Sequence, residues 1–187
     1  MKIVVIILLC GFINPPKKTI VPDTIVHKSW HVSNIYNQGT ENICTVYAVM
    51  TYLDIMGKSK PPLEFMRKWR SQGILFENLV LLGYIKSFQF SRDINTIINH
   101  IETNGPVLLD TTMYEGMVKP TQGYITDTGD RKERRHTMVL YSYDNKFYGL
   151  NSWGTSWNPT YCGGFIMSRT TLQRMLDRKD AGVWLFT

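Results

Sequence analysis

The sequence changes character at Asn104-Gly105-Pro106, and this change limits the folds that the chain can adopt. Before this point apolar residues recur at helical spacing, whereas after it short runs of β-branched and aromatic residues predominate. The expected helices cover residues 43–56, 63–69, 77–86, 92–103 and 171–177. The expected strands cover residues 107–110, 124–126, 137–143, 146–152, 165–168 and 183–186. Helices followed by strands predict an α+β fold.

The chain has 187 residues, which fits one domain or two small lobes that share a core. Hydrophobic residues make up 43% and charged residues 19%, which is typical of a globular protein and excludes a disordered one. We expect a helical lobe over residues 37–104 and a β-rich lobe over residues 105–187, with a substrate cleft between them.

The N-terminus carries Lys2 and then eleven apolar residues at positions 3–13. This run is shorter than the roughly 20 residues of a membrane-spanning helix, but it fits a signal peptide. We expect residues 1–18 to be a signal sequence or short anchor, and residues 19–187 to be the folded domain. The alternative for residues 3–13 is a buried strand. If the protein contacts a membrane, we expect it to do so through these residues. The leader favours a secreted or membrane-associated protein; a virion-associated or intracellular one is the alternative.

Three cysteines, Cys10, Cys44 and Cys162, are too few for a disulfide scaffold. None has the spacing of a zinc site, and His27 and His31 have no cysteine nearby. We therefore expect no disulfide, metal or cofactor, and we expect Cys162 to be buried.

The formal net charge is +6, and part of the excess is local. A basic cluster contains Arg131, Lys132, Arg134 and Arg135. Our first interpretation is a solvated loop, and our second is a surface that favours acidic groups in a substrate. The sequence has no phosphate-cradling glycine loop, zinc finger or RNA-binding motif, so we expect no nucleic-acid partner. Nothing in the sequence indicates the oligomeric state.

Cys44 is the candidate nucleophile. Apolar residues recur at helical spacing from Val46 to Leu53, which places Cys44 in the first turn of a helix with Thr40 or Asn42 as its candidate cap. A helix N-terminus and an imidazolium neighbour both stabilise a thiolate, which is the reactive form of cysteine. A small buried hydrophobic residue is the alternative reading of a lone cysteine.

A predicted hairpin supplies a base and a group that orients it. Asp144-Asn145 fits a two-residue turn that pairs Tyr143 with Lys146. In this register His136 and Asn151 are diagonal neighbours on one face, within reach of a side-chain hydrogen bond. A loop of odd length would separate them unless a bulge intervened. The asparagine would fix the imidazole tautomer and aim its other nitrogen at the thiol.

Several segments together resemble the papain-like cysteine peptidases. They are residues 38–44, 104–107, 136–140, 151–157 and 163–165, and the fourth begins with Asn-Ser-Trp-Gly. The chain order of Cys, His and Asn is also that of the family, and the likeness covers most of residues 20–187. The resemblance implies a compact, disulfide-free member of bacterial or viral type. It also implies a helical lobe that carries the nucleophile and a β-barrel-like lobe that carries the histidine and asparagine.

The resemblance further implies the roles of four catalytic residues. Cys44 would attack the carbonyl carbon and form a thioester, and His136 would act as acid and base. Asn151 would orient His136. The Gln38 side chain and the backbone N–H of Cys44 would form an oxyanion hole.

Three more residues are candidates for substrate binding, two from the resemblance and Arg135 from its position. Trp153 and Trp157 would line the leaving-group side of the cleft, although a tryptophan in such a strand is commonly a core residue. Arg135 precedes His136 and would lie at the cleft rim.

Two residues near the nucleophile depart from the family pattern. Glu41 stands where secreted relatives carry a cysteine, and Thr45 stands where they carry an aromatic residue. His136 follows Cys44 by 92 residues, compared with roughly 130 in papain and cathepsins, so we assign no specificity pocket.

We predict a cysteine endopeptidase. The alternatives are a Cys–His amidase or transferase acting on cell-wall or other amides, and a catalytically weak papain-like structural or binding protein of a virus particle.

Overall fold

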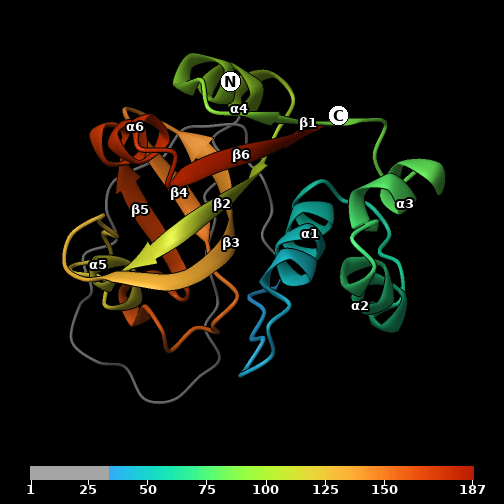
Figure 1. Ribbon diagram of the computed structural model, residues 1–187, viewed down its shortest axis with the longest axis horizontal. Helices are drawn as coiled ribbons and strands as arrows, with labels where there is room; N and C mark the ends of the chain where they lie inside the picture. The colour runs from blue at the N-terminus through green and yellow to red at the C-terminus, as the bar shows by residue number, and fades with distance from the viewer. Residues whose placement is uncertain (1–33) are drawn as a thin grey trace, which may run out of the picture.

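The structure is a computed structural model, and it describes residues 34–187 (Figure 1). In this part of the chain six antiparallel strands form one sheet, in the order β1-β6-β2-β3-β4-β5. The strands are β1 (Phe88–Ser91), β2 (Val107–Tyr114), β3 (Arg131–Tyr143), β4 (Lys146–Leu150), β5 (Gly164–Ser168) and β6 (Ala181–Phe186). The expected α+β class is confirmed. The expectations for the leader and for Cys10 lie outside the described residues.

Helices pack against both faces of the sheet. One group lies beside β3 on one side, and comprises α1 (Cys44–Ile55), α2 (Leu63–Ser71) and α3 (Leu75–Leu81) (Figure 1). The other side carries α4 (Ile94–Thr103) and α6 (Arg169–Asp177). The short helix α5 (Glu115–Val118) follows β2, and the 3-10 helix η1 (Pro159–Tyr161) precedes β5.

The central strands supply side chains to two separate cores. In β3, Met138 and Leu140 enter the core beneath α4 and α6, whereas Val139 enters the core beneath α1. Successive strand residues point to opposite faces, so an unbroken apolar run fills both cores. Full burial of each such side chain stabilises the fold by about 1.5–3 kcal/mol.

The turn between β3 and β4 differs from the expected one. Tyr143 pairs with Phe147 rather than with Lys146, so three residues lie between the paired positions. The middle one, Asn145, has a φ of 55°, in the left-handed region that asparagine tolerates better than most residues. The prediction of a two-residue turn was therefore wrong.

A β-bulge compensates for the odd turn. The register of β3 against β4 shifts between Leu140 and Ser142, and beyond the shift Val139 pairs with Leu150. This is the pairing that a two-residue turn without a bulge would give. The face on which His136 lies is therefore the face that the sequence predicts.

The starts of α1 and α4 differ from the expected ones. Neither Thr40 nor Asn42 caps α1, whose N-cap residue is Ile43 and has no side-chain cap. α4 begins at Ile94, two residues later than expected, because Asp93 adopts an extended backbone and caps the helix with its carboxylate.

Three further expectations were wrong. Residues 124–126 form no strand, and Tyr124 makes isolated bridges instead. The helix expected over residues 77–86 is α3, which ends at Leu81, since Gly83 adopts a φ of 75° that ends the helix. The basic cluster belongs to β3 and is not a loop.

The packing of α4 shows how the first half of the described chain joins the sheet. Ile94, Ile97 and Ile101 of α4 belong to the same core as the strands after Pro106. β1, which precedes α4, pairs with β6 at the sheet edge. The division into lobes at residues 104 and 105 stays a prediction, but elements on both sides of it share one core.

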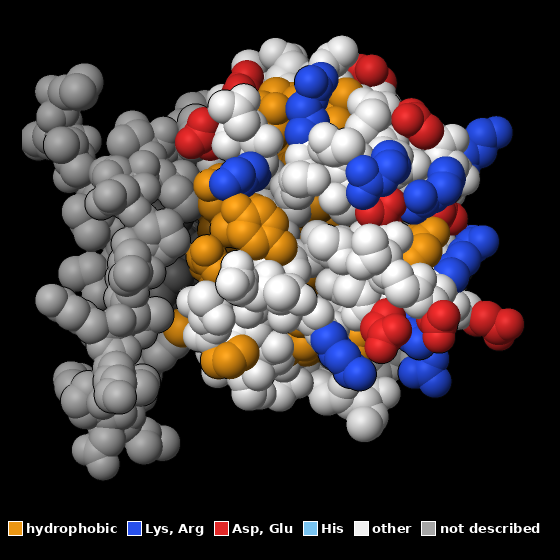
Figure 2. All heavy atoms as spheres, turned by 90° about the vertical axis from the view of Figure 1, so that its left-hand side faces the viewer, with side chains coloured by type: hydrophobic (Ala, Val, Ile, Leu, Met, Phe, Trp, Pro, Cys, Tyr) orange, Lys and Arg blue, Asp and Glu red, His pale blue; other side chains and the backbone are white. Residues whose placement is uncertain are grey.

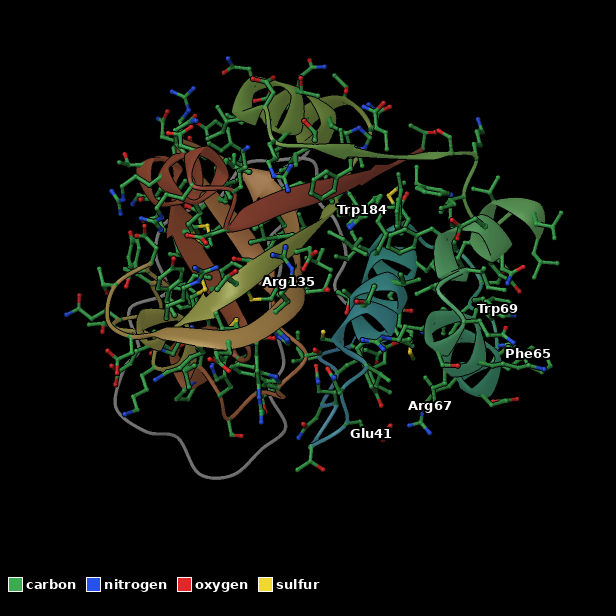
Figure 3. The ribbon with its side chains drawn as sticks, viewed as in Figure 1. Glu41, Phe65, Arg67, Trp69, Arg135 and Trp184 are labelled. Carbon is green, nitrogen blue, oxygen red and sulfur yellow. The ribbon has the colours of Figure 1, made fainter. Side chains whose placement is uncertain are left out.

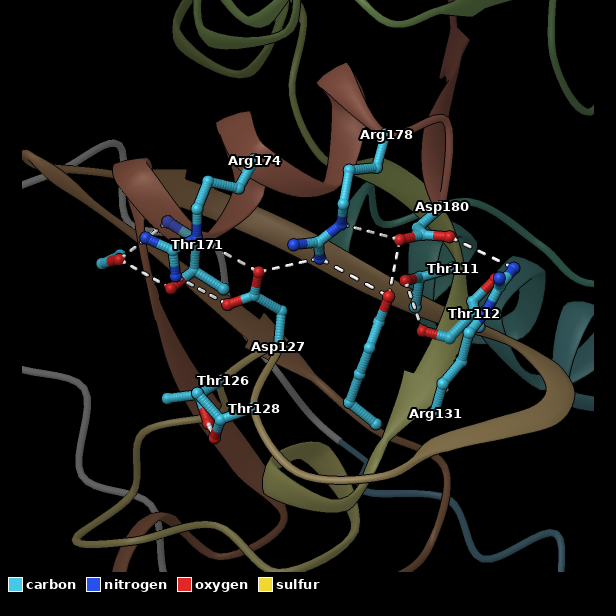
Figure 4. Close-up of polar contacts among 12 residues, drawn as sticks. Thr111, Thr112, Thr126, Asp127, Thr128, Arg131, Thr171, Arg174, Arg178 and Asp180 are labelled. Carbon is cyan, nitrogen blue, oxygen red and sulfur yellow. Dashed lines mark hydrogen bonds and ion pairs between the residues drawn. The ribbon is translucent and has the colours of Figure 1, made fainter.

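An ionic network around two buried carboxylates, those of Asp127 and Asp180, holds α6 against the end of β2 (Figure 4). Asp127 lies 2.6 Å from Arg174 and 2.8 Å from Arg178, and its side chain is 2% exposed. Arg178 also bonds Asp180 at 2.9 Å, and the Tyr114 hydroxyl donates to Asp180 at 2.5 Å. Burial would raise the pKa of Asp127, but the hydrogen bonds from the two arginines outweigh it and lower that pKa.

Positive and negative side chains alternate on the side of the molecule shown in Figure 2. Two residues of the basic cluster form ion pairs: Arg131 lies 3.2 Å from Asp180, and Arg135 lies 3.0 Å from Asp110. Carboxylates of the protein therefore neutralise part of the charge of this cluster.

We expect Asp127→Asn to lower the free energy of unfolding by about 1–3 kcal/mol, because two guanidinium groups lose a buried, charged acceptor. Urea unfolding at neutral pH measures this difference. The pKa of Asp127 is lowered by folding, so its contribution is lost as the pH falls through the folded value. The gap between variant and wild type should therefore shrink in acid.

Glu115→Gln is the matched control for this measurement. Its pair with Lys119 is 3.6 Å long and exposed, so its loss should change the stability by less than about 0.5 kcal/mol. Coincident unfolding curves for Asp127→Asn and wild type at neutral pH would show that the network does not stabilise the fold.

Candidate active site

Cys44 is the first residue of α1, and its thiol is free and buried, with 6% of the residue exposed. The backbone N–H groups of Val46 and Tyr47 both donate to the Ile43 carbonyl, which begins the helix. The N–H of Cys44 has no acceptor within the helix because it belongs to the first turn. The positive end of the helix dipole therefore acts on the thiol.

An ion pair links the segment that leads into α1 to α2. Glu41 points toward Arg67 of α2, and the two side chains lie 2.6 Å apart (Figure 3). Both side chains are more than 40% exposed, so this link contributes at most about 1 kcal/mol.

His136 and Asn151 form the hydrogen bond that the sequence predicts. The distance from His136 Nε2 to Asn151 Oδ1 is 2.7 Å, and both residues are buried. The backbone N–H of Ser152 donates to the same Oδ1 at 2.8 Å, which identifies this atom as the oxygen. Because Oδ1 can only accept, Nε2 carries a proton and Nδ1 is the nitrogen left to act on the thiol.

Trp153 packs over the imidazole of His136. The ring centroids are 4.6 Å apart, and the ring planes are tilted by 30°. Asn37, on the segment before α1, forms an isolated antiparallel bridge with Trp153. The bridge joins the entry of the nucleophile helix to the segment that follows β4.

Gln38 is held at both ends of its side-chain amide. Its Nε2 donates to the Glu41 carbonyl at 2.6 Å, and its Oε1 accepts from the Ser152 hydroxyl at 2.6 Å. One hydrogen on Nε2 is therefore engaged and the second is left over. Sequence reasoning missed the role of Ser152; its place directly after Asn151 was the signal that could have found it.

The environment changes the acidity of the Cys44 thiol. Burial alone would raise its pKa, but it is outweighed by the hydrogen bond and charge of His136 together with smaller contributions from the Thr137 backbone and hydroxyl. Together they lower the pKa of Cys44 from 9.0 to about 7. A substantial share of Cys44 is then thiolate at neutral pH.

The three expected substrate-binding residues make contacts within the protein. Trp157 meets Trp153 edge to face at 5.5 Å, and its indole N–H donates to the Val118 carbonyl at 3.0 Å. Both tryptophans pack against the core beneath α4 and α6. Arg135 bonds Asp110, as reported above, so its charge is already balanced. The binding roles of these three residues stay predictions.

The expectations for Cys162 were wrong. Cys162 is disulfide-bonded and only partly buried, so the chain is not disulfide-free. Within residues 34–187, no group of three or more His, Cys, Asp and Glu side chains could hold a metal ion. In the same range no helix has the length and hydropathy to cross a membrane.

Comparisons with known proteins add little to this geometry. No family model matches the chain, and no curated protein matches it. Among solved structures it is similar to xylellain, a cysteine protease from Xylella fastidiosa, with 19% sequence identity and a TM-score of 0.44. The match covers 55% of this chain and 40% of xylellain, so the chain spans less than half of that protein. A likeness this weak identifies neither a family nor an activity.

We expect the alkylation rate of Cys44 to rise with pH with a midpoint of about 7. In His136→Ala the midpoint should move upward, because burial still opposes the thiolate and the imidazole no longer stabilises it. Iodoacetamide labelling of the peptide that contains Cys44, followed by mass spectrometry, gives the rate for this thiol alone. Identical titration curves in wild type and variant would rule out a Cys44–His136 pair.

Proposed function

We propose that this protein is a papain-like cysteine endopeptidase with Cys44 as nucleophile. The observation that carries the proposal is the Cys44–His136–Asn151 arrangement. It combines a buried thiol of lowered pKa at a helix N-terminus with an imidazole whose tautomer is fixed by a 2.7 Å hydrogen bond. This is the pattern of an activated nucleophile, a base and a group that orients the base.

In the first half of the reaction the Cys44 thiolate attacks the carbonyl carbon of a peptide bond. The carbonyl oxygen becomes an oxyanion, which the free Nε2 hydrogen of Gln38 and the backbone N–H of Cys44 stabilise. The protonated His136 then donates its Nδ1 proton to the leaving amine. The C–N bond breaks, and a thioester of Cys44 remains.

In the second half neutral His136 removes a proton from water through Nδ1. The resulting nucleophile attacks the thioester, and the same oxyanion hole stabilises the second tetrahedral intermediate. The C–S bond breaks, which releases the carboxylic acid and restores the thiolate beside the imidazolium. Asn151 holds the ring in one orientation throughout.

Peptide-bond hydrolysis tests the proposal directly. We expect the full chain to cleave members of a peptide library in the presence of a mild reductant, and we expect Cys44→Ala to abolish cleavage. A muropeptide assayed beside the library separates the peptidase from an amidase that acts on cell walls. Hydrolysis of the muropeptide alone, or of neither substrate, would contradict the proposed peptidase.

Gln38→Ala tests the oxyanion hole. Loss of one donor should lower kcat by about 10²–10³-fold and change KM much less, because the interaction forms only as the oxyanion develops. Asn78→Ala is the control, since its amide lies on α3 and takes no part in the site. An increase in KM at unchanged kcat would assign Gln38 to substrate binding instead.

A further inference from the structure

A buried threonine lies beside the nucleophile on the opposite side of the β3 backbone from His136. Thr137 is 4% exposed, and its Oγ1 lies 3.9 Å from the Sγ of Cys44. This distance is within the range of hydrogen bonds to sulfur, which are longer than those between oxygen and nitrogen. The same Oγ1 lies 3.0 Å from the hydroxyl oxygen of Thr45.

The position of Thr137 follows from the alternation along β3. Met138 enters the core beneath α4 and α6, whereas Val139 enters the core beneath α1. By the same alternation His136 lies on the side of Met138, and Thr137 lies on the side of Val139, which faces α1. The first turn of α1 supplies both Cys44 and Thr45. Thr45 occupies the position of the family's aromatic residue, and the smaller side chain places a hydroxyl against Thr137.

The hydroxyl groups can satisfy Cys44 in both of its protonation states. In the thiol state the S–H donates to Thr137, and Thr137 donates to Thr45. In the thiolate state the sulfur can only accept, so the Thr137 O–H must turn to donate to it. The Thr45 hydroxyl can then donate to the oxygen of Thr137, so the Cys44–Thr137 and Thr137–Thr45 hydrogen bonds are both kept.

We propose that Thr137, held by Thr45, is a second hydrogen-bond donor to the Cys44 thiolate, in addition to His136. The proposal rests on the function proposed above, since the thiolate matters for catalysis only if Cys44 is the nucleophile. Thr137 is a neutral donor, so it stabilises the thiolate whether or not His136 is protonated. The backbone N–H and the hydroxyl of Thr137 both lower the pKa of Cys44, as His136 does, and replacing the side chain removes the hydroxyl alone.

Charged groups other than His136 do not account for the lowered pKa of Cys44. Among the groups that act most strongly on the Cys44 thiol, His136 is the titratable one. Glu41, which precedes α1, is exposed and bonded to Arg67. Asp110 pairs with Thr137 through the backbone of β2, but its carboxylate bonds Arg135.

The test is the pH dependence of Cys44 alkylation in Thr137→Val, which keeps the side-chain shape and removes the hydroxyl. We expect the midpoint to rise by about one pH unit, as for the loss of one hydrogen bond to a charged group. Thr45→Val should cause a smaller rise, because Thr137 keeps its own hydroxyl and loses only its partner. Thr137→Ser should return the midpoint to the wild-type value.

Thr51→Val is the matched control, because Thr51 lies in the same helix and its hydroxyl bonds only the Tyr47 carbonyl. It should titrate like wild type. A wild-type midpoint in Thr137→Val, or an equally raised midpoint in Thr137→Ser, would overturn the proposal. Either result would leave the proposed function intact. The proposed function itself fails if wild-type Cys44 titrates as an ordinary thiol and its titration does not change in His136→Ala.

Discussion

Strand β3 is the element on which the arrangement of this protein depends, because it pairs along both edges and is buried on both faces. It bonds to β2 and β4, and its side chains enter the cores beneath α1 and beneath α4 and α6. A shift of one residue would exchange its two faces. His136 and Thr137 would then change places, so the register that fills the two cores also sets the chemistry around Cys44.

Around this strand, a chain of buried polar groups joins two segments that are far apart in sequence. The Gln38 amide accepts from Ser152, and Asn151 accepts from the Ser152 N–H and from His136. The Gln38 N–H also donates to the Ser152 carbonyl at 2.8 Å. Buried polar groups are costly when unpaired, so these contacts hold the entry to α1 in one place relative to the imidazole.

Much of this arrangement could be predicted from the sequence, because apolar periodicity and strand alternation are local patterns. The helix after Cys44 and the shared face of His136 and Asn151 followed from spacing alone. The turn could not be predicted, since Asp144-Asn145 fits two loop lengths and the bulge near Leu140 depends on packing in the folded protein. The ion pairs of the basic cluster and the Thr45–Thr137 contact join distant segments, which spacing within one segment does not reveal.

The most direct measurement is the detection of an acyl group on Cys44. The full chain would be mixed with an activated ester, quenched in acid and digested, and the peptides would be analysed by mass spectrometry. If Cys44 is the nucleophile activated by His136, the peptide that contains Cys44 gains one acyl group within the first turnover, and His136→Ala abolishes this gain. An acyl group found elsewhere, or equal acylation of Cys44 in the variant, would contradict the central role of the Cys44–His136 pair.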